Sequence, residues 1–158
     1  MFIAADKIGN QLLKLIQGNE DELIANESHR PFTGSLVIIK SPKGFMLLKN
    51  KYRQTWEIAG GAIDQGETAR ECAVRECFEE SGYEIKMSDL RFVGLLKCFL
   101  TSGYVAKGID YSALYCADIQ NIKEFHENEE MSDLCWYNLG EPIEDVNEID
   151  IKLLEYYL

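Results

Sequence analysis

Three glutamates, Glu76, Glu79 and Glu80, are the residues whose types and spacing could do chemistry. Offsets of three and four residues place them on one face of a helix. Like charges at these spacings repel each other by roughly a few tenths of a kcal/mol per pair, so a purely structural helix has little reason to keep them together. A divalent cation would remove the repulsion, because hard ions such as magnesium prefer carboxylate oxygens. The alternative is an acidic helix face that is simply solvated.

The sequence around the glutamates favours the cation. The stretch from Gly61 to Tyr83 has the form Gly-x5-Glu-x7-Arg-Glu-U-x-Glu-Glu-x-Gly-U, where U is a bulky aliphatic residue. This pattern resembles the Nudix box, the signature of the Nudix hydrolases. All seven fixed positions are filled, by Gly61, Glu67, Arg75, Glu76, Glu79, Glu80 and Gly82.

Three positions depart from the family pattern. Cys77 and Tyr83 stand at the two aliphatic positions, and Ala59 replaces the proline that is common before the double glycine. Cysteine and tyrosine can both pack against apolar neighbours. We therefore interpret them as variation on the buried side of the helix, which leaves the acidic side unchanged.

The resemblance implies an α/β protein with the Nudix fold, an α/β/α sandwich around a mixed sheet. It implies magnesium as the cofactor, with manganese as a substitute. The ligands would be Glu76, Glu79, Glu80 and the carbonyl of Gly60. The reaction would be hydrolysis of the phosphoanhydride in a nucleoside diphosphate linked to a group X, a class that includes nucleoside triphosphates.

Other residues of the box would support this chemistry. Gly60 and Gly61 let the backbone approach a metal closely, whereas a Gly-Gly pair alone is usually just a turn. Arg75, which we group with Glu79 among the catalytic residues, could hydrogen-bond the neighbouring acids and fix their orientation. Glu67 could pair with Arg75 or favour the positive end of the helix. Gly82 is the expected C-terminal stop of the helix.

A general base in this family often lies outside the box, in a loop before a late strand. Here Glu127, Glu129 and Glu130 precede Trp136. Each could accept a proton from a metal-bound water if it came within hydrogen-bond reach. We predict Glu130 as the base and leave Glu127 and Glu129 open. The alternative is a solvated acidic turn.

The substrate side is less clearly specified. Lys49 and Arg53 lie in a loop that could approach the cleft, and arginine suits bidentate contact with phosphate. A plain exposed basic loop is the alternative. Phe99, Tyr104 and Tyr111 could stack on a nucleobase, although aromatic residues on strands usually belong to the core.

Family marks of particular substrates are absent downstream of the box. The ADP-ribose mark, a proline about 16 residues after the box, is missing from the stretch Cys98-Phe99-Leu100-Thr101. The tyrosine that marks diadenosine substrates at a similar distance is missing too. These absences favour a nucleoside triphosphate or another small nucleoside diphosphate derivative.

Composition limits the partners. The chain has 158 residues and 46% hydrophobic content, which suits one domain, residues 1–158. A net charge of −11 repels phosphate backbones, so we expect no nucleic-acid duplex as a partner. The sequence lacks a run of about 20 apolar residues and a basic, apolar leader, so we expect no membrane span and no secretory signal. Five cysteines without a Cys-x-x-Cys pair predict reduced thiols in a cytoplasmic protein.

The elements that must position these residues can be read from periodicity. Apolar runs predict strands at 36–39, 45–48, 56–58, 90–100, 111–117 and 134–137. The turn Ser41-Pro42-Lys43-Gly44 joins the first two strands in a hairpin. The box helix begins near Thr68 and ends near Ser81. Asn147 can cap a final helix with Ile151, Leu154 and Leu158 on one face.

Residues 1–30 form an N-terminal extension of uncertain role. Ile8, Leu12, Leu13 and Ile16 have helical spacing. Asp6 is a possible cap and Gly18 a stop, so the pattern predicts a helix. We favour packing of this segment against the core. An edge or dimer-forming element is the alternative, so a homodimer stays open.

Three hypotheses for function compete. The first is a magnesium-dependent Nudix pyrophosphohydrolase acting on a small nucleotide. The second is a non-catalytic Nudix-fold domain that binds a nucleotide and regulates something else, which predicts a degraded box. The third is a structural acidic protein that binds calcium, but no Asp-rich loop with calcium-site spacing is present. The intact box favours the first.

Overall fold

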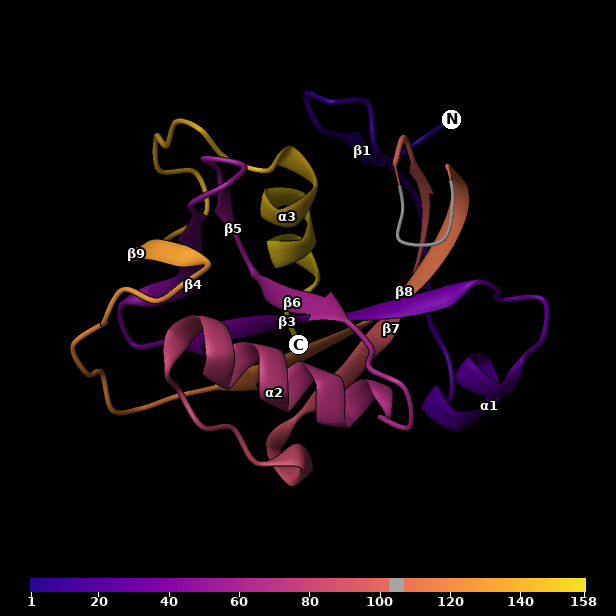
Figure 1. The fold of residues 1–158 in the computed structure, drawn as a ribbon, viewed down its shortest axis with the longest axis horizontal. Helices are drawn as coiled ribbons and strands as arrows, with labels where there is room; N and C mark the ends of the chain where they lie inside the picture. Colours follow the sequence, from indigo (N-terminus) through magenta and orange to yellow (C-terminus); the bar gives the residue numbers. More distant parts are fainter. Residues whose placement is uncertain (103–106) are drawn as a thin grey trace.

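One mixed sheet organises the molecule (Figure 1). The computed structural model describes residues 1–102 and 107–158. In this part of the chain the strands are β1 (Ala4–Ala5), β2 (Gln11–Ile16), β3 (Phe32–Ser41), β4 (Gly44–Asn50), β5 (Trp56–Glu57), β6 (Ala59–Ala62), β7 (Arg91–Leu100), β8 (Gly108–Asp118) and β9 (Met131–Tyr137). Their order is β1-β2-β7-β8-β3-β4-β5, with β6 paired to β3 and β9 paired to β4. The β3–β8 pair is parallel and the other pairs are antiparallel.

Helices cover both faces of this sheet. On one face lie α2 (Ala69–Ser81) and the short α1 (Glu20–Ala25), over a core that includes Val37, Ile39 and Tyr115. On the other face α3 (Glu148–Leu153) packs over a second core that includes Ile38 and Leu114. Two 3-10 turns, η1 (Met87–Asp89) and η2 (Leu154–Tyr156), complete the described elements. The prediction of an α/β/α sandwich with a mixed sheet is confirmed.

The box helix is where the sequence predicts it, and its ends are fixed by side chains. Thr68 accepts a hydrogen bond from the backbone N–H of Glu71, and the Glu71 side chain accepts one from Thr68, which is a capping box. Gly82 ends the helix in the left-handed conformation, with φ of +80°. Cys77 is fully buried on the sheet side and Tyr83 is nearly so, as expected for their places in the pattern.

The strands after residue 30 follow the sequence closely. The turn at 41–44 closes the β3–β4 hairpin, in which Ser41 lies opposite Gly44. The expected strand at 56–58 is β5, and the chain continues directly into β6, which carries Gly60 and Gly61. The later strands β7, β8 and β9 begin or end within a few residues of the expected positions.

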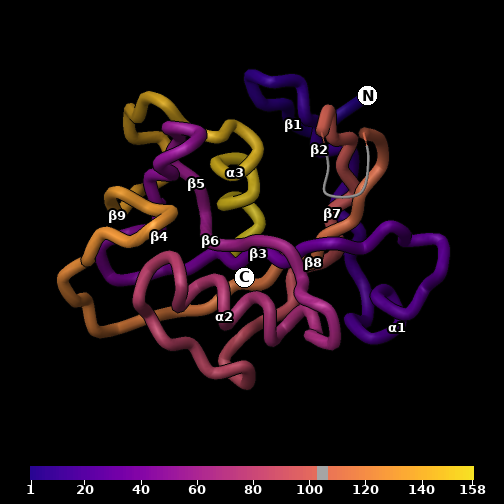
Figure 2. The backbone as a smooth tube through the Cα atoms, viewed as in Figure 1, coloured from indigo at the N-terminus to yellow at the C-terminus, as the bar shows by residue number. Residues whose placement is uncertain are grey.

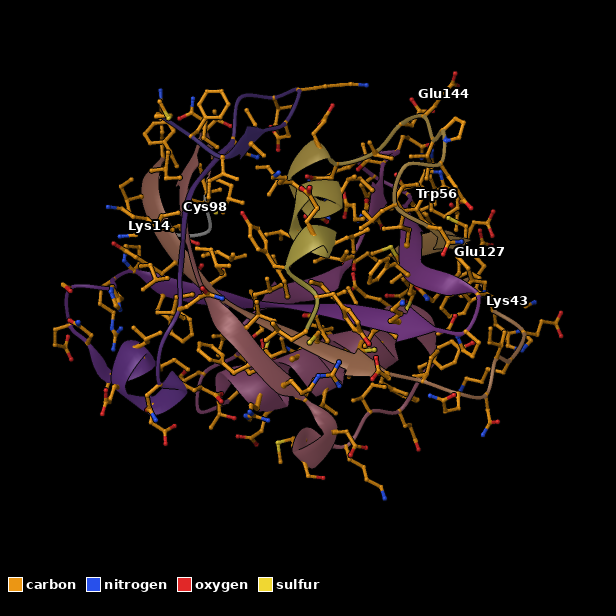
Figure 3. The ribbon with its side chains drawn as sticks, turned by 180° about the vertical axis from the view of Figure 1, so that it is seen from behind. Lys14, Lys43, Trp56, Cys98, Glu127 and Glu144 are labelled. Carbon is orange, nitrogen blue, oxygen red and sulfur yellow. The ribbon has the colours of Figure 1, made fainter. Side chains whose placement is uncertain are left out.

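The N-terminal helix prediction is wrong. Residues 11–16 form β2, which pairs with β7 and places Ile16 opposite Leu95 (Figure 2). The Asp6 carboxylate closes the turn between β1 and β2 by accepting from the N–H groups of Ile8 and Asn10, so it caps no helix. The physical reason is tertiary: β7 offers an edge to pair with, and pairing buries Leu12 while Lys14 is exposed (Figure 3). The only helix in this region is α1, which starts after Gly18.

The last helix is partly as predicted. The Asn147 side chain accepts hydrogen bonds from the N–H groups of Ile149 and Asp150, which confirms the cap. The helix ends sooner than expected, however, and Leu158 is 58% exposed. The buried side is formed by Ile149, Leu153 and Leu154, because the chain tightens into η2 after Leu153.

Two further features bear on the sequence-based expectations. All five cysteines are free, and Cys72, Cys77 and Cys116 are buried. In the part of the chain described, no helix is both long enough and apolar enough to cross a membrane.

Candidate active site

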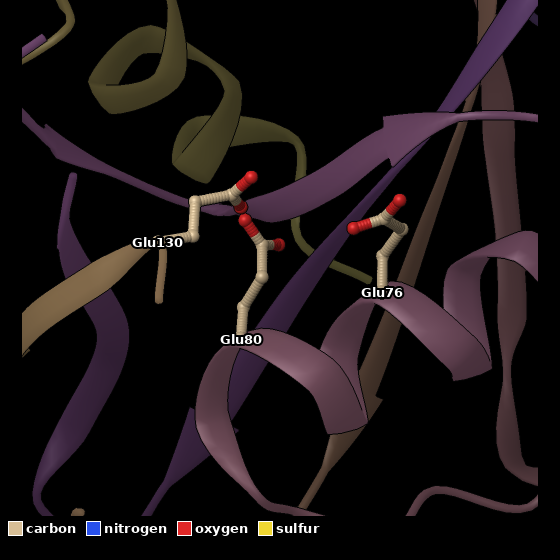
Figure 4. A group of neighbouring side chains, drawn as sticks. All are labelled: Glu76, Glu80 and Glu130. Carbon is tan, nitrogen blue, oxygen red and sulfur yellow. The ribbon is translucent and has the colours of Figure 1, made fainter. Parts of the chain in front are cut away.

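Three carboxylates converge at one end of the box helix. Glu76 and Glu80 project from α2, and Glu130 projects from the residue just before β9 (Figure 4). One carboxylate oxygen of each lies within 4.8 Å of the others. Glu80 is buried, Glu76 is half-buried and Glu130 is exposed. The group is therefore anchored deep in the protein on one side and open to solvent on the other.

Pairing of strands brings Glu130 to the helix. β9 runs antiparallel to β4, with Met131 opposite Asn50. The N–H of Lys51 donates to the carbonyl of Glu130 at 2.8 Å, which extends this pairing to the site. A residue that is 50 positions from Glu80 in the chain is thus fixed beside it by the sheet.

The strand that carries Gly60 and Gly61 forms the wall of the site. The N–H of Gly60 donates to a carboxylate oxygen of Glu80 at 2.8 Å. A Cβ atom on Gly61 would lie 2.5 Å from the carboxyl carbon of Glu76. A Cβ on Gly60 would lie 2.5 Å from the carbonyl oxygen of Ser35. Both glycines are therefore required by close approach, and only glycine at 61 leaves room for the Glu76 carboxylate.

Arg75 links the loop, the strand and the helix of the box. Its Nε and Nη2 donate to the two carboxylate oxygens of Glu67 at 2.7 and 2.9 Å. Its Nη1 donates to Glu76 at 2.9 Å and to Glu79 at 3.2 Å, and Nη2 also donates to the carbonyl of Ala62 at 3.0 Å. These bonds hold the pKa of Glu67 at about 2, well below its ordinary value. The expected Arg75–Glu67 pair is present, and Arg75 also fixes the rotamer of Glu76.

Glu79 does not join the converging carboxylates in the part of the chain described. Its side chain is 56% exposed and turns toward Arg75. Of the three glutamates that the sequence places on one helix face, the structure brings Glu76 and Glu80 together and leaves Glu79 on their flank. A role for Glu79 as a metal ligand stays a prediction.

Burial makes the carboxylate group unfavourable without a cation. Desolvation raises the pKa of Glu76, with Arg75 opposing it. Desolvation also raises the pKa of Glu80 well above its usual range, and a hydrogen bond with Glu130 adds to the shift. Carboxylate oxygens crowded together in this way fit a hard divalent cation such as magnesium or manganese, because the ion supplies the missing positive charge. The donors that would hold it are oxygens only.

Asn128 is a site residue that sequence reasoning missed. Its side-chain oxygen accepts from the N–H groups of Glu130 and Met131 at 3.0 and 2.9 Å. Its side-chain nitrogen donates to the carbonyl of Glu80 at 2.8 Å. Asn128 thus joins the acidic segment to the end of α2. The available signal was an asparagine two residues before the candidate base, a position from which it closes an Asx turn.

The other acids of the same segment lie elsewhere. Glu127 pairs with Lys51 at 3.5 Å and is 62% exposed (Figure 3). Glu129 is exposed. Among the three acids that the sequence leaves open, the structure therefore brings Glu130 alone into the described carboxylate group.

The two predicted substrate-binding cations already have acidic neighbours. Lys49 lies 3.8 Å from Asp145 and over the ring of Trp56. Arg53 donates through two nitrogens to Glu57, at 2.7 and 2.8 Å. Both stay predictions as substrate contacts.

The aromatic residues considered for base stacking divide differently. Tyr111 is buried, and its ring centroid lies 5.2 Å from that of His29, so it belongs to the packed interior. Phe99 is half-buried on β7. Tyr104 lies outside the described residues.

A mixed sheet between helices, with a box helix that presents carboxylates beside a double glycine, defines the class of protein. Residues 29–157 match the family model of the NUDIX domain. The chain belongs to the NUDIX family.

Individual relatives resemble parts of the chain. A Bacillus subtilis protein to which 8-oxo-dGTP diphosphatase activity is provisionally assigned is 38% identical over 53 residues, which are 34% of this chain and 36% of that protein. The RNA pyrophosphohydrolase of Hydrogenovibrio crunogenus is 33% identical over 79 residues, which are 50% of this chain and 46% of that protein. The matched stretch thus spans less than half the length of either relative.

A solved structure resembles the whole fold. The crystal structure of a variant of the Bacillus subtilis pyrophosphohydrolase BsRppH superposes with a TM-score of 0.64 at 21% identity. The superposition covers 94% of this chain and 87% of the other. At this level of identity the likeness supports the fold alone.

The contact between Gly61 and Glu76 gives a first test. We expect Gly61→Ala to displace the Glu76 carboxylate and weaken manganese binding by about tenfold or more, as measured by isothermal titration calorimetry. Gly66→Ala is the matched control, because its φ is +80° but no atom lies within 4 Å of the added Cβ. That control should cost about 1 kcal/mol of stability and leave manganese binding intact. Equal affinities for wild type and Gly61→Ala would contradict the steric account.

The pKa of Glu80 gives a second test. Its raised value means that the folded state holds the proton more tightly than the unfolded state. The resulting stability is full below the ordinary pKa of 4.5 and is lost as the pH rises above it. In chelator, we expect the melting temperature of wild type to fall with rising pH more steeply than that of Glu80→Gln. Glu84→Gln, which changes an exposed acid, is the control and should keep the wild-type slope. A Glu80→Gln protein with that same slope would refute this origin.

Proposed function

We propose that the chain is a divalent-cation-dependent pyrophosphohydrolase that cleaves the phosphoanhydride of a nucleoside diphosphate linked to X, and in particular of a nucleoside triphosphate. One observation carries the proposal. Carboxylates from α2 and from the segment before β9 converge beside Gly60 and Gly61, in a chain that belongs to the NUDIX family. This is the arrangement that metal-assisted attack of water on a phosphoanhydride requires.

Magnesium or manganese would be held by Glu76, Glu80 and Glu130 together with the carbonyl of Gly60, with Glu79 as a further ligand. A bound cation neutralises charge on the phosphates and makes a coordinated water more acidic. The fit rests on the donor set, which consists of oxygens, and on the Gly61 backbone, which leaves room for the Glu76 carboxylate.

The chain's own residues then divide the remaining work. Glu130 is the exposed member of the group, so its carboxylate can accept the proton of the attacking water. Asn128 holds the backbone of Glu130 in place. Arg75 keeps Glu76 oriented. Lys49 and Arg53 would contact the phosphates from the loop side.

The two named relatives suggest different substrates, a modified nucleoside triphosphate and RNA. The net charge of −11 disfavours the extended contacts that an RNA chain would make. We therefore propose a mononucleotide substrate. β1 and β2 extend the same sheet, which supports treating residues 1–158 as one domain.

A substrate panel tests the proposal. Nucleoside triphosphates, nucleoside diphosphate sugars and 5′-triphosphorylated RNA would each be incubated with magnesium, and phosphate or pyrophosphate release would be scored. We expect turnover of at least one mononucleotide, its loss in excess chelator, and its loss in Glu80→Gln. Nucleotide binding without turnover of any compound would instead identify a non-catalytic domain.

The role of Glu130 can be tested on whichever substrate the panel finds. We expect Glu130→Gln to lower the maximal rate by roughly 10^2- to 10^4-fold, because the proton acceptor is lost. Glu129→Gln removes an adjacent exposed acid and should stay close to wild type. Equal effects at both positions would mean that the segment acts through its overall charge.

A further inference from the structure

Glu57 is a buried carboxylate for which the proposed chemistry has no direct use. It lies on β5, and its side chain is 7% exposed. It accepts hydrogen bonds from Nε and Nη2 of Arg53 at 2.7 and 2.8 Å and from the hydroxyl of Thr55 at 2.6 Å. A buried carboxylate needs such donors, so the pair with Arg53 has to be strong.

Arg53 is held in the opposite way. Its side chain is 60% exposed, although one edge of its guanidinium is bonded to Glu57. The bonds to Glu57 use Nε and Nη2, so the edge formed by Nη1 and Nη2 faces no bonded partner in the described part of the chain. An arginine whose one edge is clamped presents the other edge in a fixed direction, at little further cost in side-chain entropy.

The turn that carries Arg53 adjoins the carboxylate site. The buried side chain of Asn50 accepts from the N–H groups of Tyr52 and Arg53, both at 2.9 Å. The N–H of Lys51 donates to the carbonyl of Glu130. The turn is thus bonded on one side to Arg53 and on the other to the backbone of the candidate base.

The surrounding charges point the same way. Bonding to Glu57 raises the pKa of Arg53, and the charges of Glu57, Glu130 and Asp150 add to the effect. Asp150 is buried on α3 and accepts from the N–H of Ile58 at 3.0 Å. A polyphosphate that approaches this side of the site meets carboxylates, so a fixed cation beside them has a task that the metal alone does not fill.

We propose that Glu57 is a positioning residue, which orients Arg53 so that its free edge binds a phosphate oxygen of the substrate away from the metal-binding carboxylates. The inference rests on the proposed function, in that it assigns the phosphate contact to one edge of one side chain. The competing account is that Arg53 merely neutralises a buried acid. The two accounts differ in what Glu57 does once Arg53 is gone.

A double-mutant cycle separates them. The probe is inorganic tripolyphosphate with magnesium, and its binding is measured by calorimetry. We expect Arg53→Met and Glu57→Gln each to weaken binding by about tenfold, the size of one charge-assisted contact. We expect Glu57→Gln to have no further effect when Arg53→Met is already present. Arg91→Met is the matched control, because it breaks an arginine–aspartate pair at Asp118 and should leave binding unchanged.

Two additional measurements keep the result clear. Thr55→Val removes one donor to Glu57 and leaves Arg53 in place, so it should weaken binding less than Glu57→Gln while the protein folds normally. Arg53→Lys should fail to restore wild-type affinity, because lysine cannot bond to Glu57 and phosphate by separate edges. Unchanged affinity in Arg53→Met, or equal effects of Glu57→Gln with and without Arg53, would overturn the proposal. A silent substrate panel would instead remove the proposed function, and tripolyphosphate binding would still report on Arg53.

Discussion

The site depends on one guanidinium group. Arg75 bonds to Glu67 in the loop, to the carbonyl of Ala62 after the double glycine, and to Glu76 on the helix. Without that cation the loop, the strand and the helix of the box would meet only through carboxylates and carbonyls, all of which carry negative charge. The attraction between Arg75 and these oxygens lets acids be packed at a density that their mutual repulsion opposes. The group beyond Arg75, formed by Glu76, Glu80 and Glu130, is left with negative charge to bind a cation.

Most of the site could be predicted because its information is local. The box is a fixed spacing within one stretch of chain, so Gly61, Glu67, Arg75 and Gly82 could each be assigned a structural role without knowing the fold. The position of Glu79 shows the limit of spacing. On a helix of about 100° per residue, Glu79 and Glu80 diverge from Glu76 in opposite directions, by about 60° and about 40°. The side on which Arg75 sits then decided which of them turned away.

Non-local features were harder to read. Apolar residues in the segment 11–16 have a spacing that suits a helix or a strand, and the free edge of β7 selected the strand. The same kind of information selected Glu130 from its acidic neighbours, because the register between β4 and β9 and the turn closed by Asn128 fix which residue meets α2. The bond between Arg53 and Glu57 links residues four apart, yet no pattern indicated it, since it depends on the burial of Glu57.

The order of strands also governs how the protein can assemble as it leaves the ribosome. β2 finds its partner only in β7, and β3 finds its parallel partner only in β8, so Ile16 waits for Leu95 and Phe32 waits for Tyr111. Until those later strands are made, the earlier ones carry open edges, which are the part of a nascent sheet most prone to pair wrongly. Pairings so distant in sequence make for slow folding. The carboxylate group is closed only when β9 is added, so a partly synthesised chain cannot yet hold the cation that would stabilise it.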